Sequence, residues 1–381
     1  MTPTRKKKVV ADFKTRFGEP ECLVRAPGRA NIIGEHVDYC EGLVLPFAIK
    51  QSMYFCGKRR NDSLVYLHAF DYSKTIQLES EKEAPNWSKY FLQIINLLGK
   101  KKGLNQGFDL SFGSDIPIGG GVSSSSALCC GFLLLLNELL GLRLSKRQIL
   151  NLASEAEHGI GLRGGKMDQT AIMFGKKDKA IFLDCKNETH QFIDLSLEEN
   201  KFVLFDTGVK HSLVDSEYNK RREEVDLALK CVCKSIGKEV SFRELTLTDI
   251  AFLEKESTVL FNRISHVISE IDRVKQSVKA IDAKEYSSLG LLMNDSHRSL
   301  KERLEVSCNE LDFIAEHLQR QANVYGARMM GGGFGGNVIA LVKSGYSGGF
   351  NKLTSDYEER FGIKLKIIEV EPGKGASIEK I

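Results

Sequence analysis

A stretch rich in glycine and serine is the part of the sequence best suited to binding phosphate. Residues 117–127 read PIGGGVSSSSA and lead directly into an apolar run. Consecutive glycines let backbone N–H groups approach an anion, and serines that open a helix add hydroxyl donors at the positive end of its dipole. The structural alternative, a glycine turn with one capping serine, needs fewer residues of both types. The stretch therefore predicts a phosphate-binding loop.

The order of residues separates this loop from two common nucleotide-binding motifs. A Walker A motif has a Lys directly before its Ser or Thr, and residues 117–127 contain no Lys. A dinucleotide-binding fold needs a βαβ unit with an acidic residue about 20 positions further on, and no such pattern follows. The loop thus belongs to a different class of phosphate site.

Residues 29–39 (RANIIGEHVDY) concentrate charged side chains around a glycine. A solvated polar loop is the plain alternative. The segment lies between strand-like runs and contains two isoleucines, however, which favours a fixed backbone with converging polar groups. Carboxylates accept hydrogen bonds and histidine can donate or accept, a combination that suits several hydroxyls of one sugar ring.

Two further segments place functional groups beside glycines. Residues 164–169 read GGKMDQ, and Asp168 follows Glu157 by eleven positions. One carboxylate could take a proton from a substrate hydroxyl, and the other could hold Mg²⁺. Residues 329–336 (MMGGGFGG) form a second glycine-dense loop between two predicted strands, for which a strained hairpin is the alternative.

Together these segments resemble the galactokinase branch of a family of small-molecule kinases that also includes homoserine, mevalonate and phosphomevalonate kinases. Residues 28–39 fit G-R-x-N-[LI]-I-G-E-H-x-D-Y at every fixed position, 117–125 fit P-x-G-G-G-[LV]-S-S-S, and 167–169 read M-D-Q. Segments 216–218, 305–308 and 331–336 also resemble family segments, in the family's order. The resemblance covers about residues 22–342.

The resemblance implies a role for each matching residue. Asp168 would face the anomeric hydroxyl of the sugar, and Arg29 would balance its charge. The implied sugar contacts are Glu35, His36, Asp38, Gly165 and Tyr218. The implied ATP contacts are Gly119, Gly120, Gly121, Ser123, Ser124 and Ser125, with Trp87 and Tyr90 on the adenine side. Ser125 and Glu157 would hold Mg²⁺, and core packing is the alternative role for Trp87.

The implied reaction is ATP-dependent phosphorylation of galactose to galactose 1-phosphate. An N-acetylgalactosamine 1-kinase and a sensor that binds ATP and sugar without turnover are the alternatives. The complete serine loop, with both Arg29 and Asp168 present, favours an enzyme over the sensor. Two features depart from the family pattern: Lys166 stands where the branch usually has an apolar residue, and the spacer between Glu157 and Asp168 is one residue shorter.

The pattern of apolar residues predicts the elements that position these segments. The expected helices are 9–17, 87–98, 123–141 and 145–158, followed by helical periodicity over 211–321. The expected strands are 22–29, 43–49, 53–58, 64–70, 108–112, 180–183, 202–205, 328–331, 338–342 and 365–370.

Length and composition set the remaining expectations. A chain of 381 residues exceeds what one core usually serves. We therefore expect an α+β, two-domain small-molecule kinase fold; the resemblance implies a ribosomal-S5-like N-terminal domain (1–198) and a ferredoxin-like C-terminal domain (199–381).

Composition also bears on partners and compartment. The net charge of +4 is too small to indicate a nucleic-acid partner, and the longest apolar run, 127–140, is shorter than the roughly 18 residues that span a bilayer. The chain shows no targeting segment, and its nine scattered cysteines lack a C-x-x-C pair. We expect a cytoplasmic protein that acts on a small sugar, without nucleic acid or membrane, as a monomer or weak homodimer.

Overall fold

The structure, a computed structural model of the chain, describes residues 4–78, 85–102, 106–117, 121–209, 214–346 and 348–381. Its first sheet has six strands in the order β13-β1-β3-β6-β4-β5, in which only the β4–β6 pair is parallel. These strands are β1 (Cys22–Asn31), β3 (Pro46–Arg59), β4 (Val65–Ala69), β5 (Lys74–Gln77), β6 (Phe108–Ser114) and β13 (Ser377–Ile378). The C-terminal end of the chain thus returns to the sheet that its N-terminal part begins.

One predicted pair of strands was wrong. The expected strands 43–49 and 53–58 were separated at the polar residues 50–52, but β3 runs through them without a turn. Ser52 pairs with Pro27 of β1, so the partner strand holds this polar stretch in the sheet. Leu43–Val44 instead forms β2, which pairs with β7.

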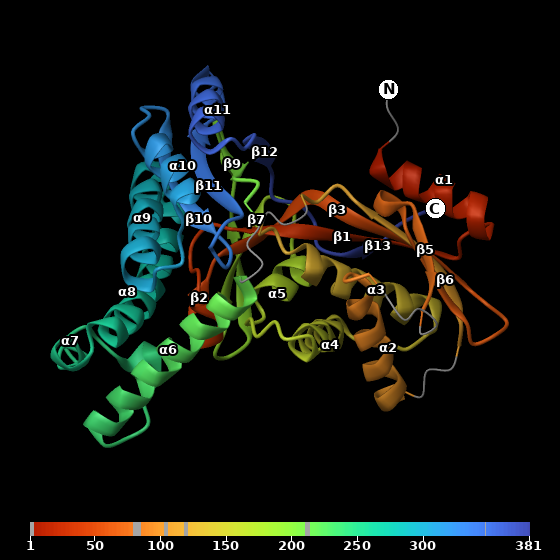
Figure 1. Cartoon of the computed structure of the whole chain (residues 1–381), viewed down its shortest axis with the longest axis horizontal. Helices are drawn as coiled ribbons and strands as arrows, with labels where there is room; N and C mark the ends of the chain where they lie inside the picture. Colours follow the sequence, from red (N-terminus) through yellow and green to blue (C-terminus); the bar gives the residue numbers. More distant parts are fainter. Residues whose placement is uncertain (1–3, 79–84, 103–105, 118–120, 210–213, 347) are drawn as a thin grey trace.

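Helices cover both faces of the first sheet. They are α1 (Arg5–Phe17), α2 (Ser88–Lys102), α3 (Ser124–Leu139), α4 (Lys146–Gly159) and α5 (Met167–Phe174). The apolar α3 packs on β1 and β3. Val9 and Phe13 of α1 pack with Leu23 on the opposite face, because successive strand residues point to opposite faces. Figure 1 shows α1 on one side of the sheet and α2, α3 and α4 on the other.

The predicted starts of α2, α3 and α4 are confirmed to within one residue, whereas α1 begins four residues before its predicted start. Ser145 caps α4 through a capping box with Gln148, as the sequence indicated. The helix α5 was not predicted because its eight residues are too few to show helical periodicity.

A second, antiparallel sheet has the order β10-β11-β9-β12. Its strands are β9 (Asn200–Asp206), β10 (Val324–Met330), β11 (Asn337–Lys343) and β12 (Lys366–Val370). The helices of this part are α6 (Val214–Ile236), α7 (Leu253–Glu256), α8 (Thr258–Asp282), α9 (Tyr286–Ser299), α10 (Asn309–Gln319) and α11 (Gly348–Phe361), of which α11 was not predicted. A small third sheet joins β2 to β7 (Lys179–Asp184) and β8 (Thr189–Asp194).

One apolar core connects the parts of the molecule. Buried residues of the first sheet and of β9 belong to a single cluster, in which the rings of Phe47 and Phe202 lie 5.4 Å apart. The domain boundary at 198/199 stays a prediction. Within the ranges described above, no helix combines the length and the apolar character that a membrane span requires.

Candidate functional site

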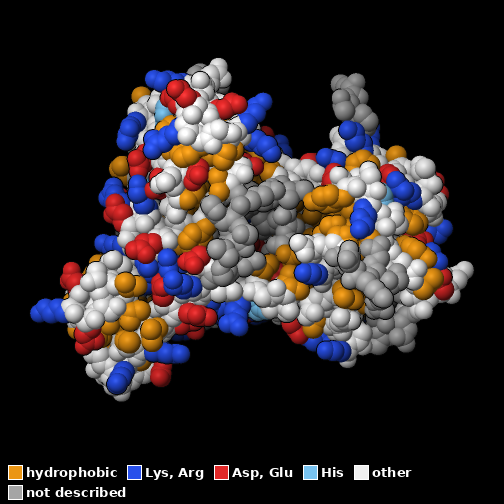
Figure 2. All heavy atoms as spheres, in the orientation of Figure 1, with side chains coloured by type: hydrophobic (Ala, Val, Ile, Leu, Met, Phe, Trp, Pro, Cys, Tyr) orange, Lys and Arg blue, Asp and Glu red, His pale blue; other side chains and the backbone are white. Residues whose placement is uncertain are grey.

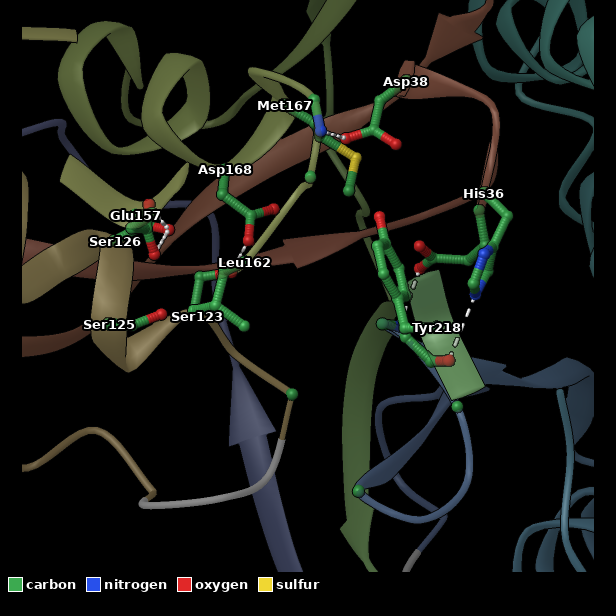
Figure 3. A pocket seen from close by; sticks show the side chains of 18 of the residues that line it. His36, Asp38, Ser123, Ser125, Ser126, Glu157, Leu162, Met167, Asp168 and Tyr218 are labelled. Atoms are coloured by element: carbon green, nitrogen blue, oxygen red, sulfur yellow. Dashed lines mark hydrogen bonds between the residues drawn. The ribbon is translucent and has the colours of Figure 1, made fainter. Parts of the chain in front are cut away.

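The residues that follow β1 and the loop between β10 and β11 meet across a cavity of about 500 Å³, which α3, α5 and α6 also line. Two groups of side chains face each other in it (Figure 3). The serine side comprises Arg29, Ser123, Ser124, Ser125, Ser126, Glu157, Asp168 and Gln169. The His36 side comprises Glu35, His36, Asp38, Gly165 and Tyr218.

Asp168, in the first turn of α5, is held by residues of two other segments. Arg29 Nε donates to Asp168 Oδ1 at 2.7 Å, and Arg29 Nη2 donates to Oδ2 at 3.1 Å. The hydroxyl of Ser123, directly before α3, also donates to Oδ2. A bidentate guanidinium–carboxylate pair is both strong and directional. The Asp168 carboxylate is therefore oriented before any substrate binds.

A bulge in β1 brings Arg29 to the serine loop. The register of β1 against β3 shifts between Pro27 and Arg29. A Cβ atom at Gly28 would lie 3.0 Å from the carbonyl oxygen of Val122, so glycine permits this close approach. Arg29 N then donates to the same carbonyl at 3.2 Å, and its side chain donates to the carbonyl of Gly121. Strand, serine loop and Asp168 are thus joined through one arginine.

Glu157 of α4 lies on the serine side among neutral donors. Ser126 Oγ lies 3.0 Å and 2.9 Å from its two carboxylate oxygens, and Gln169 Nε2 donates to Oε2 at 2.5 Å. Gln169 Oε1 is buried and has no hydrogen-bond partner among the described residues. The buried carboxylate of Glu157 therefore lies beside a buried acceptor, Gln169 Oε1, that lacks a hydrogen-bond partner among the described residues.

His36 is fixed as a neutral imidazole. Its Nε2 lies 3.1 Å from the carbonyl oxygen of Gly332, and its Nδ1 lies 2.8 Å from the hydroxyl of Tyr39. Since a carbonyl only accepts, Nε2 carries the proton and Nδ1 accepts from Tyr39. Burial lowers the pKa of His36 to about 3. The ring of Tyr218 lies 5.0 Å from that of His36 and closes this side of the cavity.

Two carboxylates accompany His36. Glu35 Oε1 accepts from the backbone N–H of Gly331 at 3.0 Å and from Arg328 Nη2 at 3.1 Å. Asp38 Oδ2 accepts from the backbone N–H of Gly165 at 3.1 Å. Each carboxylate is therefore tied to a glycine-rich segment that is distant in sequence.

Burial shifts the pKa of one carboxylate on each side. The pKa of Asp38 is raised to about 7 by burial and by the charges of Asp168 and Glu35. The pKa of Glu157 is raised to about 7 by burial and by Asp168, against hydrogen bonds from Ser125, Gln169 and Ser126. Burial would lower the pKa of Arg29, but nearby acids, Asp168 first, raise it above its ordinary value. Both carboxylates thus occupy sites where added positive charge or a hydroxyl donor would favour ionisation.

The cavity brings together most of the predicted site residues. Those among its described lining are Arg29, Glu35, His36, Asp38, Tyr90, Gly121, Ser123, Ser124, Ser125, Glu157, Gly165, Asp168 and Tyr218. Trp87 is not among the lining residues; its ring packs 5.2 Å from Phe112 and 5.8 Å from Phe91. Gly119 and Gly120 lie outside the described residues.

Three side chains that hydrogen-bond to the predicted carboxylates Glu157 and Glu35 were not themselves predicted as site residues. Ser126 and Gln169 contact Glu157, and both belong to motifs that the sequence displays, so their positions beside the named residues were a signal. Arg328 contacts Glu35 from β10. No sequence pattern connects these two residues, because only the fold brings them together.

Three family models match the chain. The "Galactokinase galactose-binding signature" covers residues 11–59, "GHMP kinases N terminal domain" covers 89–176, and "GHMP kinases C terminal" covers 277–348. The first includes the segment with Arg29, Glu35 and Asp38, and the second includes the serine loop and Asp168.

Relatives match over nearly the full length. A galactokinase of Thermotoga maritima is 40% identical, over 94% of this chain and 99% of that protein, and one of Clostridium perfringens is 35% identical over 95% and 97%. The crystal structure of Lactococcus lactis galactokinase complexed with galactose superposes with a TM-score of 0.90 at 32% identity, covering 98% of this chain and 100% of that one. A mevalonate kinase structure shares the fold with a TM-score of 0.62 at 20% identity. The predicted α+β kinase fold is confirmed, and the chain belongs to the galactokinase family of GHMP kinases.

Proposed function

We propose that this protein transfers the γ-phosphoryl group of ATP to the anomeric hydroxyl of galactose, producing galactose 1-phosphate. The observation that carries the proposal is the Asp168 carboxylate, oriented by Arg29 and Ser123 in the cavity that also contains the His36 side. The names of the relatives from Thermotoga, Clostridium and Lactococcus support galactose as the acceptor.

The serine side would perform the transfer. Asp168 would accept a hydrogen bond from the anomeric hydroxyl of the sugar. It would finally take the proton of that hydroxyl as the anomeric oxygen attacks the γ-phosphorus of ATP. Arg29 would keep the carboxylate oriented and offset negative charge near the reacting atoms. Phosphoryl transfer passes through a loose transition state that needs mainly positioning and charge stabilisation. A preoriented carboxylate–guanidinium pair supplies both.

The donor set fits Mg²⁺. This cation is commonly held by one or two protein oxygens together with substrate phosphates, and Glu157 with the hydroxyl of Ser125 would provide such a pair. A hydrated cation at this position would favour ionisation of Glu157, whose pKa is raised. It would also give Gln169 Oε1, which lacks a partner among the described residues, a hydrogen bond. When bound, Mg²⁺ would neutralise charge on the ATP phosphates. Among the described residues no cluster of three or more acidic, His or Cys ligands exists, so the phosphates would complete the coordination.

The nucleotide would lie along the start of α3. Gly121, Ser123 and Ser124 would contact its phosphates, together with the predicted contacts at Gly119 and Gly120. Backbone N–H groups at a helix N-terminus attract such anions. Tyr90 lines the cavity and would contact the adenine, whereas Trp87 would act through its packing in the aromatic cluster.

The His36 side would bind the sugar. Glu35 and Asp38 would accept hydrogen bonds from sugar hydroxyls, and His36, Gly165 and Tyr218 would shape the ring site. A carboxylate at Glu35 would accept from a 6-hydroxyl and repel the carboxylate of galacturonate. A pentose has no 6-hydroxyl to donate to Glu35 Oε2, and the missing hydrogen bond costs on the order of 1–3 kcal/mol. These terms favour a neutral hexose.

A coupled ADP-release assay with ATP, Mg²⁺ and each sugar in turn tests the proposal. We expect turnover on galactose with kcat/KM above that on N-acetylgalactosamine. A higher value on N-acetylgalactosamine would reverse the assignment of the acceptor. Sugar and ATP binding without turnover on any sugar would instead identify a sensor.

The proposal also covers the partners, the compartment and the oligomeric state of the protein. Lys and Arg side chains are interspersed with Asp and Glu on the face shown in Figure 2, which fits a small sugar rather than a nucleic acid as partner. All nine cysteines are free, as expected in the reducing cytoplasm. We propose a monomer or weak homodimer with its domain boundary at 198/199.

A further inference from the structure

Arg328 of β10 is a fully buried arginine whose three side-chain nitrogens all donate hydrogen bonds. Its side chain is 0% exposed. Nε donates to the carbonyl oxygen of Ile32 at 2.7 Å, Nη1 to that of Met329 at 2.7 Å, and Nη2 to that of Asn31 at 2.6 Å and to Glu35 Oε1 at 3.1 Å. Through this side chain, β10 is hydrogen-bonded to the end of β1 and to the first residues after it.

Glu35 is held on one oxygen only. Both hydrogen bonds that its carboxylate makes with described residues, from Arg328 and from the N–H of Gly331, end on Oε1. Its backbone carbonyl lies 3.2 Å from Nε2 of the buried His266. Main chain and side chain are therefore both fixed, while Oε2 keeps its capacity to accept a hydrogen bond.

We propose that Arg328 is a positioning residue that sets sugar specificity: it locks Glu35 so that Oε2 is presented to the 6-hydroxyl of the acceptor. This inference rests on the proposed function, since it requires a hexose bound at the His36 side. Arg328 does not touch the sugar; it acts through Glu35.

The guanidinium suits this task better than an ammonium would. Its planar fork reaches three carbonyls and a carboxylate at once, and every one of these groups would lose a partner if the arginine moved. A rotation that moved the carboxylate of Glu35 away from Arg328 would leave buried charges without their partner, which is strongly unfavourable. The carboxylate consequently has one stable orientation, and discrimination at the 6-position depends on that orientation.

The test compares galactose with 6-deoxygalactose, which lacks only the 6-hydroxyl. In the Arg328→Met variant we expect kcat/KM on galactose to fall about 10- to 100-fold, mainly through KM, and the value on 6-deoxygalactose to fall much less. The ratio of kcat/KM on galactose to kcat/KM on 6-deoxygalactose would therefore fall sharply. An unchanged ratio, with both sugars affected equally, would overturn the proposal and leave Arg328 a structural residue.

Arg243 offers a matched control. It too pairs with a carboxylate, Asp184, and donates to two carbonyls of the N-terminal part, those of Glu41 and Gly42. Its carboxylate partner does not line the cavity, whereas Glu35 does. Arg243→Met should lose stability and keep the wild-type sugar ratio. If Arg328→Met does not fold, Arg328→Lys, which retains the charge but not the fork, carries the same prediction of a reduced ratio.

Calorimetric binding of the two sugars to the wild-type protein separates this inference from the proposed function. Absence of turnover combined with tighter binding of galactose than of 6-deoxygalactose would refute the kinase activity, and loss of that preference in the Arg328 variant would still support the positioning role. Equal binding of both sugars by the wild type would refute the inference itself.

Discussion

The serine side and the His36 side of the cavity are assembled from different parts of the chain. Every described residue of the serine side comes from β1, α3, α4 or α5, except Ser123, which directly precedes α3. The His36 side needs the residues after β1, Gly165 before α5, Tyr218 of α6 and the loop between β10 and β11, with Arg328 and His266 behind it. The geometry that we propose for phosphoryl transfer is thus set within one part of the molecule, whereas the proposed sugar site depends on how distant segments pack together.

This difference predicts two kinds of defect. Changes on the serine side should lower kcat and leave the affinity for sugar nearly intact. Changes on the His36 side should act first on the affinity for sugar and on the choice between sugars.

The largest effect is expected for Asp168→Asn. The amide cannot accept the proton of the anomeric hydroxyl, and it weakens the pair with Arg29, so kcat should fall about 10²- to 10⁴-fold. ATP and galactose should still bind, as measured by calorimetry. Asp194→Asn is the control, because that aspartate pairs with Lys179 at the surface and its loss should leave kcat unchanged. Wild-type turnover in Asp168→Asn would refute the role of the carboxylate.

Adding a single methyl group at Gly165 should affect the His36 side much more than the serine side. A Cβ atom at Gly165 would lie 2.6 Å from Asp38 Oδ2 and 2.8 Å from the backbone carbon of Asp38, so neither side-chain rotation nor a small shift relieves the clash. Gly165→Ala should raise the KM for galactose about 10- to 100-fold, with a smaller effect on the KM for ATP.

Gly164→Ala is the matched control for this variant. A Cβ atom there would meet only the hydroxyl of Tyr218, at 3.9 Å, which is ordinary contact. Equal kinetic effects of the two alanine variants would show that backbone freedom, and not the contact with Asp38, explains the glycines.

The pH dependence of stability should reveal Asp38 directly. Its pKa is raised from an ordinary value near 4 to about 7, so the folded protein binds more protons than the unfolded chain between these values. Its stabilising contribution is therefore fully present below about pH 4 and is lost as the pH rises through about 7. Without ligands, Asp38→Asn should leave the Tm nearly unchanged at about pH 4 and raise it by a few degrees at about pH 8.

The same variant should bind galactose more weakly at both pH values, which would mark Asp38 as a residue retained for binding at a cost in stability. A Tm difference that does not change with pH would contradict the assigned titration.

Sequence reasoning named residues on both sides of the cavity. It missed Ser126 and Gln169, which adjoin predicted residues, and it missed Arg328 behind the His36 side, for a physical reason. The hydroxyls of Ser123 to Ser126 follow each other at the start of one helix, and Glu157 and Asp168 lie within a few dozen residues of them. Such local spacing constrains geometry, so types and order suffice to predict the chemistry. Glu35, in contrast, meets Gly331 and Arg328 only because β10 packs beside the end of β1.

The secondary structure divides in the same way. Long elements with strong periodicity, such as α3 and α4, were predicted from the sequence. The strand β3 and the helix α5 were not, because pairing with β1 overrides the polar residues 50–52 and because α5 is too short to show a period.

The smallest effect is expected for Lys166, the residue that departs from the family pattern beside the segment that contains Asp168. Its ammonium group pairs with Glu188 Oε1 at 2.5 Å, and Glu188 also pairs with Arg147. Lys166 lines a separate cavity on the other side of Gly164 and Gly165, and it does not line the cavity that contains Asp168. A partly exposed pair of this kind contributes at most about 1 kcal/mol to stability. Lys166→Ala should therefore change the ratio of kcat/KM between galactose and N-acetylgalactosamine less than about twofold, as should the control Arg147→Ala, which removes the other partner of Glu188. A larger change in Lys166→Ala alone would mean that this side chain reaches the sugar through Gly165, and the His36 side would then extend beyond the residues that line the cavity.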